Sequence, residues 1–260
     1  NDILMKAIWT GAIGFGLVNI PVKLYSATEE SSLDLDMLDK KDHSHIKYKR
    51  VNEKTGKEVA WENIVKGYDY DGKYIVLDEK DFEKAMPEKT KILSIDHFVQ
   101  EDEIDSIYFE TPYFLEPQKN GEAPYTLLVE ALKKTKMAGV GTFVMRNKEV
   151  LGILRPYDNI ILFQRIRYDQ EIRKTADLSV PKKSVKPAEL KMAVTLIEQL
   201  SEKFDISAYK NTYSEKLMKV IEAKAKGKKV TAPKLRVAHV KTKDLMEQLK
   251  ASLSAKKKAS

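Results

Sequence analysis

The sequence predicts an α+β protein that is mainly β. It indicates a closed or nearly closed antiparallel β structure, followed by a helical C-terminal region and a basic tail. Three observations support this class. The first 175 residues are mostly short apolar runs separated by turn residues, with few helical patterns. From about residue 175 the apolar residues recur at helical spacing. Beyond residue 227 lysines dominate.

Strand patterns open the chain. Alternating apolar residues predict a strand over 17–25, and Pro21 inside it indicates an edge strand or a bulge, because proline cannot donate to a ladder. Segments 46–51 and 57–61 flank a turn containing Gly56 and predict a hairpin. Further strands are expected at 73–78, 91–100 and 104–110, with a short helix over 78–89 ending near Pro87.

Helical spacing appears first at 123–139. Tyr125, Leu128, Val129 and Leu132 share one face there, and Gly139 is the expected C-cap. Three strands are expected within 141–168, joined by turns at 147–148 and 156–159. After a polar linker, Pro187 suits the first turn of a helix. Helices are therefore predicted over 187–205, 209–226 and 242–254.

The glycines of 11–16 raise the question of a nucleotide loop. Gly14 and Gly16 are followed by Asn19 where a dinucleotide fingerprint requires glycine, and the next residues favour a strand rather than a helix. No Gly-Lys pair is followed by Ser or Thr, so a P-loop is excluded. We expect these glycines to mark a bulge or a close backbone approach.

Catalytic and metal chemistry have little support. The chain has no cysteine, and His43 and His45 are the only close histidines, without an H-E-x-x-H motif. The acidic run 101–105 is expected to be a solvated turn. We predict no catalytic residue, no metal and no cofactor, hence no enzyme. The chain has no cysteine and no apolar run near 20 residues, and no signal peptide opens it, with Met5 as the expected start. These features favour a cytoplasmic protein without a membrane partner.

Charge is concentrated at one end. The chain carries a net charge of +7, and residues 211–260 hold 14 of its 46 basic residues but only 4 of its 39 acidic ones, a local charge of +10. Such asymmetry indicates a polyanion partner, nucleic acid or an acidic membrane surface, although a tail that only aids solubility is an alternative.

Spaced cations on the β region suggest a surface that follows a phosphate backbone without reading bases. Lys47 and Lys49 are expected on one strand face, and so are Arg165 and Arg167. The sequence shows no RNP-like aromatic pair for stacking on single-stranded bases. The candidate DNA-binding residues are Lys47, Lys49, Arg50, Arg146, Lys148, Arg155, Arg165, Arg167, Arg173 and Lys174.

Several long strings resemble prokaryotic Ku proteins. They are KAIWTGAIGFGLVNIPVKLYSATEE, DHSHIKYKRVNEKTGKEV, IVKGYDYDGKYIVL, PYFLEPQKNGEAPYTLLVEAL and FVMRNKEVLGILRPYDNIILFQRIRYDQEIR. The resemblance covers about residues 5–175 and continues more loosely beyond. It implies a Ku-like β-barrel core with an extended dimerisation arm (5–180), a helical C-terminal region (181–227) and a basic extension (228–260).

The resemblance also implies a function. Two subunits of such proteins form a ring around duplex DNA, bind double-strand ends in non-homologous end joining and recruit a multidomain ATP-dependent DNA ligase (ligase D). The expected partners are therefore double-stranded DNA ends, a second copy of the chain and ligase D, in the nucleoid. The helical region is the expected ligase-recruiting part, where Tyr209, Tyr213 and Leu217 are candidate anchors, although packing within the region is the commoner role of such residues.

Two other functions stay open at this point. One is an enzyme that acts on DNA ends through a lysine amine, although no activating site accompanies the lysines. The other is a general nucleoid or RNA-binding protein that depends on the basic tail.

Overall fold

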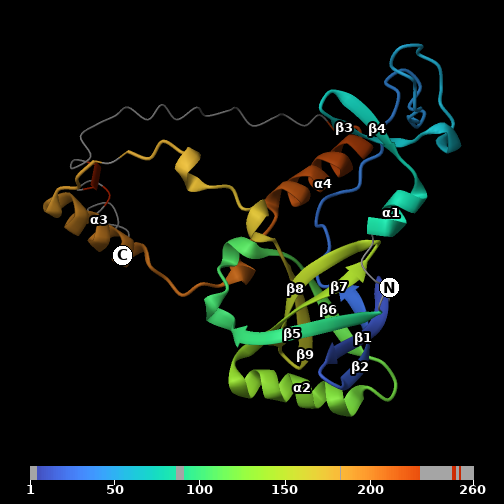
Figure 1. The fold of residues 1–260 in the computed structure, drawn as a ribbon. Coiled ribbons are helices and arrows are strands. Elements are labelled where there is room, and N and C mark those ends of the chain that lie inside the picture. The colour runs from blue at the N-terminus through green and yellow to red at the C-terminus, as the bar shows by residue number, and fades with distance from the viewer. Residues whose placement is uncertain (1–4, 86–90, 182, 229–247, 250–251, 253–260) are drawn as a thin grey trace. The chain divides into compact units, whose positions relative to one another are not determined.

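The computed structural model describes residues 5–85, 91–181, 183–228, 248–249 and 252 (Figure 1). The chain divides into two compact units. One consists of Asn1–Glu30 and Leu35–Lys174, and the other of Ser31–Asp34 and Thr175–Ser260. Among the described residues, the named strands lie in the first unit, and the second unit contains the helices over 187–200 and 212–225.

Seven strands close into a barrel in the order β1-β2-β6-β9-β8-β7-β5. This confirms the predicted closed β structure. Neighbouring strands are antiparallel except β1 and β5, which pair in parallel over Ala12–Gly14 and close the barrel. The strands are β1 (Trp9–Phe15), β2 (Val18–Ser26), β5 (Ile92–Gln100), β6 (Phe109–Pro117), β7 (Met137–Met145), β8 (Lys148–Tyr157) and β9 (Ile160–Ile166).

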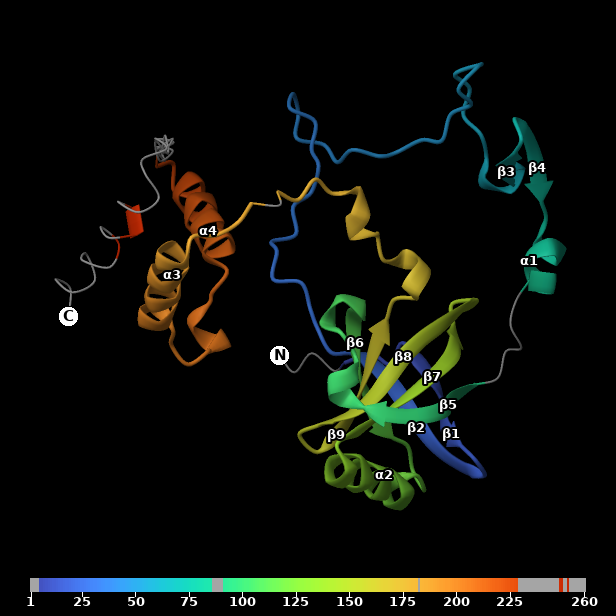
Figure 2. The ribbon, with the colours of Figure 1, turned by 60° about the vertical axis from the view of Figure 1, so that its left-hand side comes forward.

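The core fills the barrel and extends to one helix. Alternate residues of the strands, such as Ile13, Leu93 and Phe163, are fully buried because successive side chains of a strand point to opposite faces. Helix α2 (Glu122–Thr135) lies against one end of the barrel in both views (Figures 1 and 2). Its four predicted apolar residues are all buried, which confirms that face: Tyr125, Leu128, Val129 and Leu132.

Two of the opening glycines, Gly11 and Gly14, are close-approach positions, as predicted. A Cβ on Gly11 would overlap the Lys91 carbonyl oxygen, and one on Gly14 would lie 2.7 Å from Cγ2 of Ile92. Gly16 occupies the β1–β2 turn at φ +57°, a conformation that favours glycine. Gly11 and Gly14 therefore allow β1 to lie close to β5.

Pro21 does not mark an edge strand or a bulge, contrary to our expectation. Strand β2 pairs with β1 on one side and with β6 on the other. The Pro21 carbonyl accepts a hydrogen bond from the Gln118 N–H at 2.8 Å, so the proline nitrogen also faces the β6 side. Pairing with β6 begins only at Val22, and the missing N–H therefore falls just outside that ladder.

An arm, residues 27–91, connects β2 with β5. It contains the ribbon β3 (Lys66–Tyr70) and β4 (Lys73–Leu77), followed by helix α1 (Glu79–Ala85). The strand over 73–78 is thus confirmed, whereas β3 was missed. The region of Pro87 lies outside the described residues.

The prediction of a hairpin with two regular strands over 46–61 is wrong. Only an isolated bridge joins Val51 and Glu58 there. Its turn is confirmed, since Gly56 has φ +65°. Nearly every side chain in this stretch is exposed, so little burial is available to extend the pairing.

Other boundaries also moved. A 3-10 turn (Ser106–Tyr108) replaces the first part of the strand predicted over 104–110. Helix α2 ends before Gly139, because Lys136 takes the left-handed cap conformation at φ +55° and β7 starts at once. Gly139 lies inside β7 against the Ile95 side chain. The tight turn predicted at 147–148 falls one residue earlier, at 146–147, whereas the turn at 158–159 lies within the predicted range 156–159.

The second unit contains helices α3 (Pro187–Leu200) and α4 (Thr212–Ala225). Pro187 occupies the first turn as predicted, but α3 ends before residue 205 and α4 begins after residue 209. The side chain of Asn211 caps α4 by accepting the Ser214 N–H. The helix over 242–254 and the basic tail fall largely outside the described residues. None of the helices in the described ranges is long and apolar enough to cross a membrane.

Candidate nucleic-acid interface

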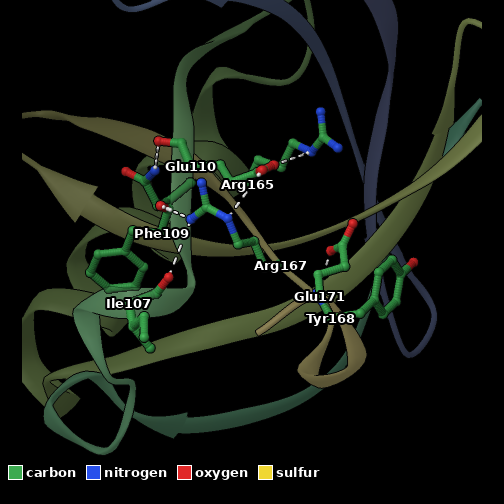
Figure 3. A network of polar contacts seen from close by, with 8 residues as sticks. Ile107, Phe109, Glu110, Arg165, Arg167, Tyr168 and Glu171 are labelled. Carbon is green, nitrogen blue, oxygen red and sulfur yellow. Dashed lines mark hydrogen bonds and ion pairs between the residues drawn. The ribbon is translucent and has the colours of Figure 1, made fainter. Parts of the chain in front are cut away.

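Arg165 and Arg167 lie on the same side of the barrel wall and share one carboxylate (Figure 3). Nε of Arg165 is 2.8 Å from Oε2 of Glu110, and Nε of Arg167 is 3.5 Å from Oε1 of the same side chain. Their predicted common face is therefore confirmed. The carboxylate offsets part of their charge, which the sequence did not indicate.

A bulge places Glu110 between the two arginines. The β6–β9 register shifts between Phe109 and Pro112, and Glu110 lies within that irregular stretch. Its carbonyl accepts a hydrogen bond from Nε2 of Gln164 at 2.8 Å. Gln164 is almost fully buried, so this bond satisfies a polar side chain inside the barrel wall. Bulges commonly redirect a side chain in this way.

The two arginines differ in what else they bind. Nη1 of Arg167 donates to the carbonyl oxygens of Phe109 at 2.7 Å and Ile107 at 3.2 Å. Arg165 has no further contact of this kind among the described residues, and its side chain is 43% exposed. Arg167 therefore holds the start of β6, whereas Arg165 is more available to a ligand.

Tyr168 extends this cluster. Its hydroxyl donates to Oε1 of Glu149 at 3.3 Å, and its N–H donates to Oε2 of Glu171 at 2.8 Å. Burial and then the nearby Glu149 charge raise the pKa of Tyr168, and Arg165 opposes that shift. The hydroxyl stays protonated at neutral pH and adds no negative charge beside Arg165.

Arg155 is engaged in an internal ion pair. Its Nη1 lies 2.9 Å from Oε1 of Glu101, its side chain is 27% exposed, and its Nε is buried with no partner in the described part of the chain. A phosphate would have to displace Glu101 to use this guanidinium. Arg155 is therefore a weaker DNA-contacting candidate than its position in the sequence indicated.

The cations of the arm are more exposed. Lys47, Lys49 and Arg50 are all exposed to solvent. Their segment is not a regular strand, so the prediction that Lys47 and Lys49 share one strand face is wrong. Lys49 lies 2.6 Å from Glu58 in an exposed ion pair, which contributes little stability. The Arg50 guanidinium lies 4.6 Å from the ring centroid of Trp61.

Two more candidates line a cavity. Arg146 and Lys148 lie at the β7–β8 turn and border a cavity of about 550 Å³, together with Lys66 of β3. Arg173 and Lys174 follow β9 and are exposed. The structure thus brings Arg146 close to Lys148 and Arg165 close to Arg167, but it does not gather all ten candidates into one surface.

Comparisons with known proteins agree with this architecture. The family described as the Ku70/Ku80 beta-barrel domain matches residues 14–192. Proteins named non-homologous end joining protein Ku are 40% identical in Coxiella burnetii, over 97% of this chain and 96% of the relative, and 38% identical in Archaeoglobus fulgidus, over 97% and 100%. The chain belongs to the Ku family.

A third Ku relative, from Bacillus subtilis, is 41% identical over 96% of this chain and 82% of its own length. Among solved structures, the SPOC domain of human PHD-finger protein 3 is 15% identical with a TM-score of 0.32, over 62% of this chain and 97% of that domain. That likeness is too weak to support an inference.

The partner-binding candidates of this Ku chain lie around the start of α4. Tyr209 stacks on Phe204, with ring centroids 6.1 Å apart, and is 73% exposed. Tyr213 is 72% exposed, and Leu217, one turn further, is half-buried. Two exposed aromatic residues and one packed leucine are thus close in sequence within the second unit.

Sequence reasoning missed the acidic partners and Lys66. Glu110 and Glu101 were hidden because they meet their arginines only when distant strands pair. Lys66 was missed with β3, although Asp71-Gly72 between two alternating runs is a strong hairpin signal. The part of the chain that the structure describes holds no group of three or more His, Asp or Glu able to bind a metal.

Proposed function

We propose that this Ku chain binds the ends of double-stranded DNA, without sequence preference, in non-homologous end joining. The observation that carries the proposal is the family match over residues 14–192, together with relatives that carry this name over almost the whole chain. The exposed cations support it, because contacts to phosphate need no particular base sequence. No catalytic role is part of the proposal.

The arm supports a homodimer. Many of its large apolar side chains are exposed in the single chain, among them Leu35, Tyr48, Trp61 and Val65 at 62–80%. Apolar surface on this scale is typical of a protein–protein interface. A second copy would cover it and, with two arms, would enclose a duplex in a closed ring. Such a ring loads only from an end, so its topology is the source of end specificity.

The helical region supports the recruitment of a partner. We propose that residues 5–180 form the barrel core and arm, that 181–227 recruit ligase D, and that 228–260 extend the basic charge. Leu190, Ile197 and Leu200 of α3 are more than half exposed, as are Tyr209 and Tyr213. We place the protein at the nucleoid, in the cytoplasm.

The decisive experiment compares one DNA sequence in two topologies. Linear and covalently closed circular forms are titrated at the same salt concentration. Binding of the linear form alone supports threading onto an end. Equal binding of both forms would instead point to a general polyanion binder, and deletion of 228–260 would then abolish it. Borohydride trapping on an abasic duplex tests for a lysine-based lyase, for which we expect no covalent adduct.

A further inference from the structure

The ribbon β3–β4 is a short two-stranded hairpin with a defined register. Asp71 and Gly72 form its turn, at φ +51° and +80°, which is the pattern of a two-residue hairpin turn. Tyr68 faces Ile75, and Tyr70 faces Lys73. All residues of both strands are exposed except Leu77, so the ribbon leaves both of its faces open in the single chain.

One face of this ribbon combines aromatic rings with cations. Residues two apart in a strand share a face, so Lys66, Tyr68 and Tyr70 lie in one row and Lys73 lies beside Tyr70. We call these four residues the tyrosine face. Both rings are 65% exposed.

The opposite face has a different character. It carries Asp69 beside Tyr74. The carboxylate of β3 is thus separated from the tyrosine face. Positive charge and aromatic rings are together on one side of the ribbon only.

The tyrosine face leads to further cations. Lys66 lines the cavity of about 550 Å³ that Arg146 and Lys148 also border. Its Nζ lies 4.9 Å from the ring centroid of Phe82 in α1, and Phe82 lines the same cavity. Glu79 and Glu83 also line it, so the lining carries three positive and two negative charges.

We propose that the tyrosine face binds unpaired nucleotides, namely a single-stranded overhang at a DNA end. Base–aromatic stacking combined with a cationic path for the backbone is the usual means of binding single strands without sequence preference. This inference rests on the proposed function, because it adds a second contact at an end that the ring already holds.

The spacing of the two rings favours a single strand over a duplex. Residues two apart in a strand are about 7 Å apart, twice the rise per residue. Successive bases of a duplex strand are about 3.4 Å apart and remain stacked on one another. Tyr68 and Tyr70 can therefore each receive a base only where neighbouring bases have separated, as they do in an overhang.

The test compares two DNA ends and two faces of the ribbon. A blunt duplex and the same duplex with an eight-thymidine 3′ overhang are titrated with the full chain, its Y68A/Y70A variant and its Y74A variant. Tyr74 is the matched control, since it is a tyrosine of the same ribbon that lies on the opposite face and is also well exposed, at 73%. A 2-aminopurine in the overhang reports stacking through its fluorescence. The Y68F/Y70F variant keeps both rings.

We expect Y68A/Y70A to weaken binding of the overhang duplex by about 25-fold, from about fivefold for each of two stacked bases, and to leave the blunt duplex unchanged. Y74A and Y68F/Y70F should bind both DNAs like the wild type. Equal losses on both DNAs, or no loss on the overhang, would overturn the inference. So would a change of oligomeric state in Y68A/Y70A alone, because the face would then be a contact between subunits.

Failure of the proposed function would look different. In that case the wild type would not bind the blunt duplex. An eight-thymidine single strand would then be titrated with the same variants. A loss confined to Y68A/Y70A would still support the stacking site, and equal binding by all variants would reject it.

Discussion

Nε of Arg165 lies 2.8 Å from Oε2 of Glu110 on the neighbouring strand β6. Because the Arg165 side chain is also 43% exposed, we expect that it exchanges this carboxylate for a phosphate when DNA binds. Arg167 contacts the same carboxylate but is held by two backbone carbonyls as well. The two arginines therefore lead to different predictions.

Replacing Arg165 with glutamine should weaken duplex binding equally for unrelated sequences. We expect the slope of log K against log salt concentration to fall by about 0.9, the value for one lost phosphate contact on duplex DNA. Titrations at four salt concentrations measure it. Lys134→Gln in α2 makes the same charge change outside the candidate set and should leave the slope unaltered. A wild-type slope in Arg165→Gln would remove this residue from the interface.

Replacing Arg167 with alanine should reduce stability. The change removes two hydrogen bonds from a charged donor to the carbonyls of Ile107 and Phe109, and we expect a loss of about 1–2 kcal/mol in the free energy of unfolding. Urea denaturation measures it. Arg165→Ala, which loses a surface ion pair, should cost less than about 1 kcal/mol. Equal losses for both variants would contradict the structural role given to Arg167.

Replacing Tyr125 with phenylalanine should also destabilise the barrel. The Tyr125 hydroxyl donates to the Leu115 carbonyl and accepts the Ile161 N–H at 2.7 Å, so it joins α2 to both β6 and β9. Its loss leaves a buried donor and a buried acceptor without this partner, at a cost of about 1–3 kcal/mol. Chemical denaturation at pH 7 gives this value. Tyr157→Phe, which alters an exposed ring, should be neutral.

Tyr125 should also make the free energy of unfolding fall at high pH. Burial raises the pKa of Tyr125 above its ordinary value of 10.0, an effect that the hydrogen bond from Ile161 opposes. The folded protein therefore keeps a proton that the unfolded chain releases. This contribution is complete below pH 10 and is lost as the pH rises from 10 through the folded-state pKa.

The comparison of wild type with Tyr125→Phe isolates that effect. Urea midpoints between pH 8 and pH 11 should fall more steeply for the wild type above pH 10. Other tyrosines with raised pKa values, such as Tyr25 and Tyr108, are present in both proteins and cancel. Parallel curves would show that Tyr125 does not contribute.

Gly141 should not tolerate a side chain. A Cβ there would overlap the backbone carbonyl of Ser94 in β5, and backbone cannot move aside as a flexible side chain can. We expect Gly141→Ala to cost about 3 kcal/mol of unfolding free energy. The control is Gly67→Ala in β3, where the nearest atom would lie at an ordinary 3.4 Å. Similar melting temperatures for the wild type and Gly141→Ala would disprove the close approach.

The sequence by itself determined the class of this protein and most of its elements. Period-two and helical apolar patterns arise from burial of one face, which is a local property, so β2, β5 and the buried face of α2 could be predicted directly. The long strings shared with Ku proteins predicted the family. A prediction made from neighbouring residues alone was wrong where a distant residue matters. Gly139 was expected to cap a helix, but it lies in a strand against Ile95 of another strand.

Only the tertiary structure decided which cations are available to a ligand and which are held by internal contacts. Arg155, Arg165 and Arg167 look alike as exposed strand residues in the sequence. Their surroundings depend on which strands meet, and a bulge in β6 placed Glu110 between two of them. Strand pairing joins residues far apart in the chain, so neither the ion pairs nor the closing parallel pair of β1 and β5 leaves a signal within any short window of sequence.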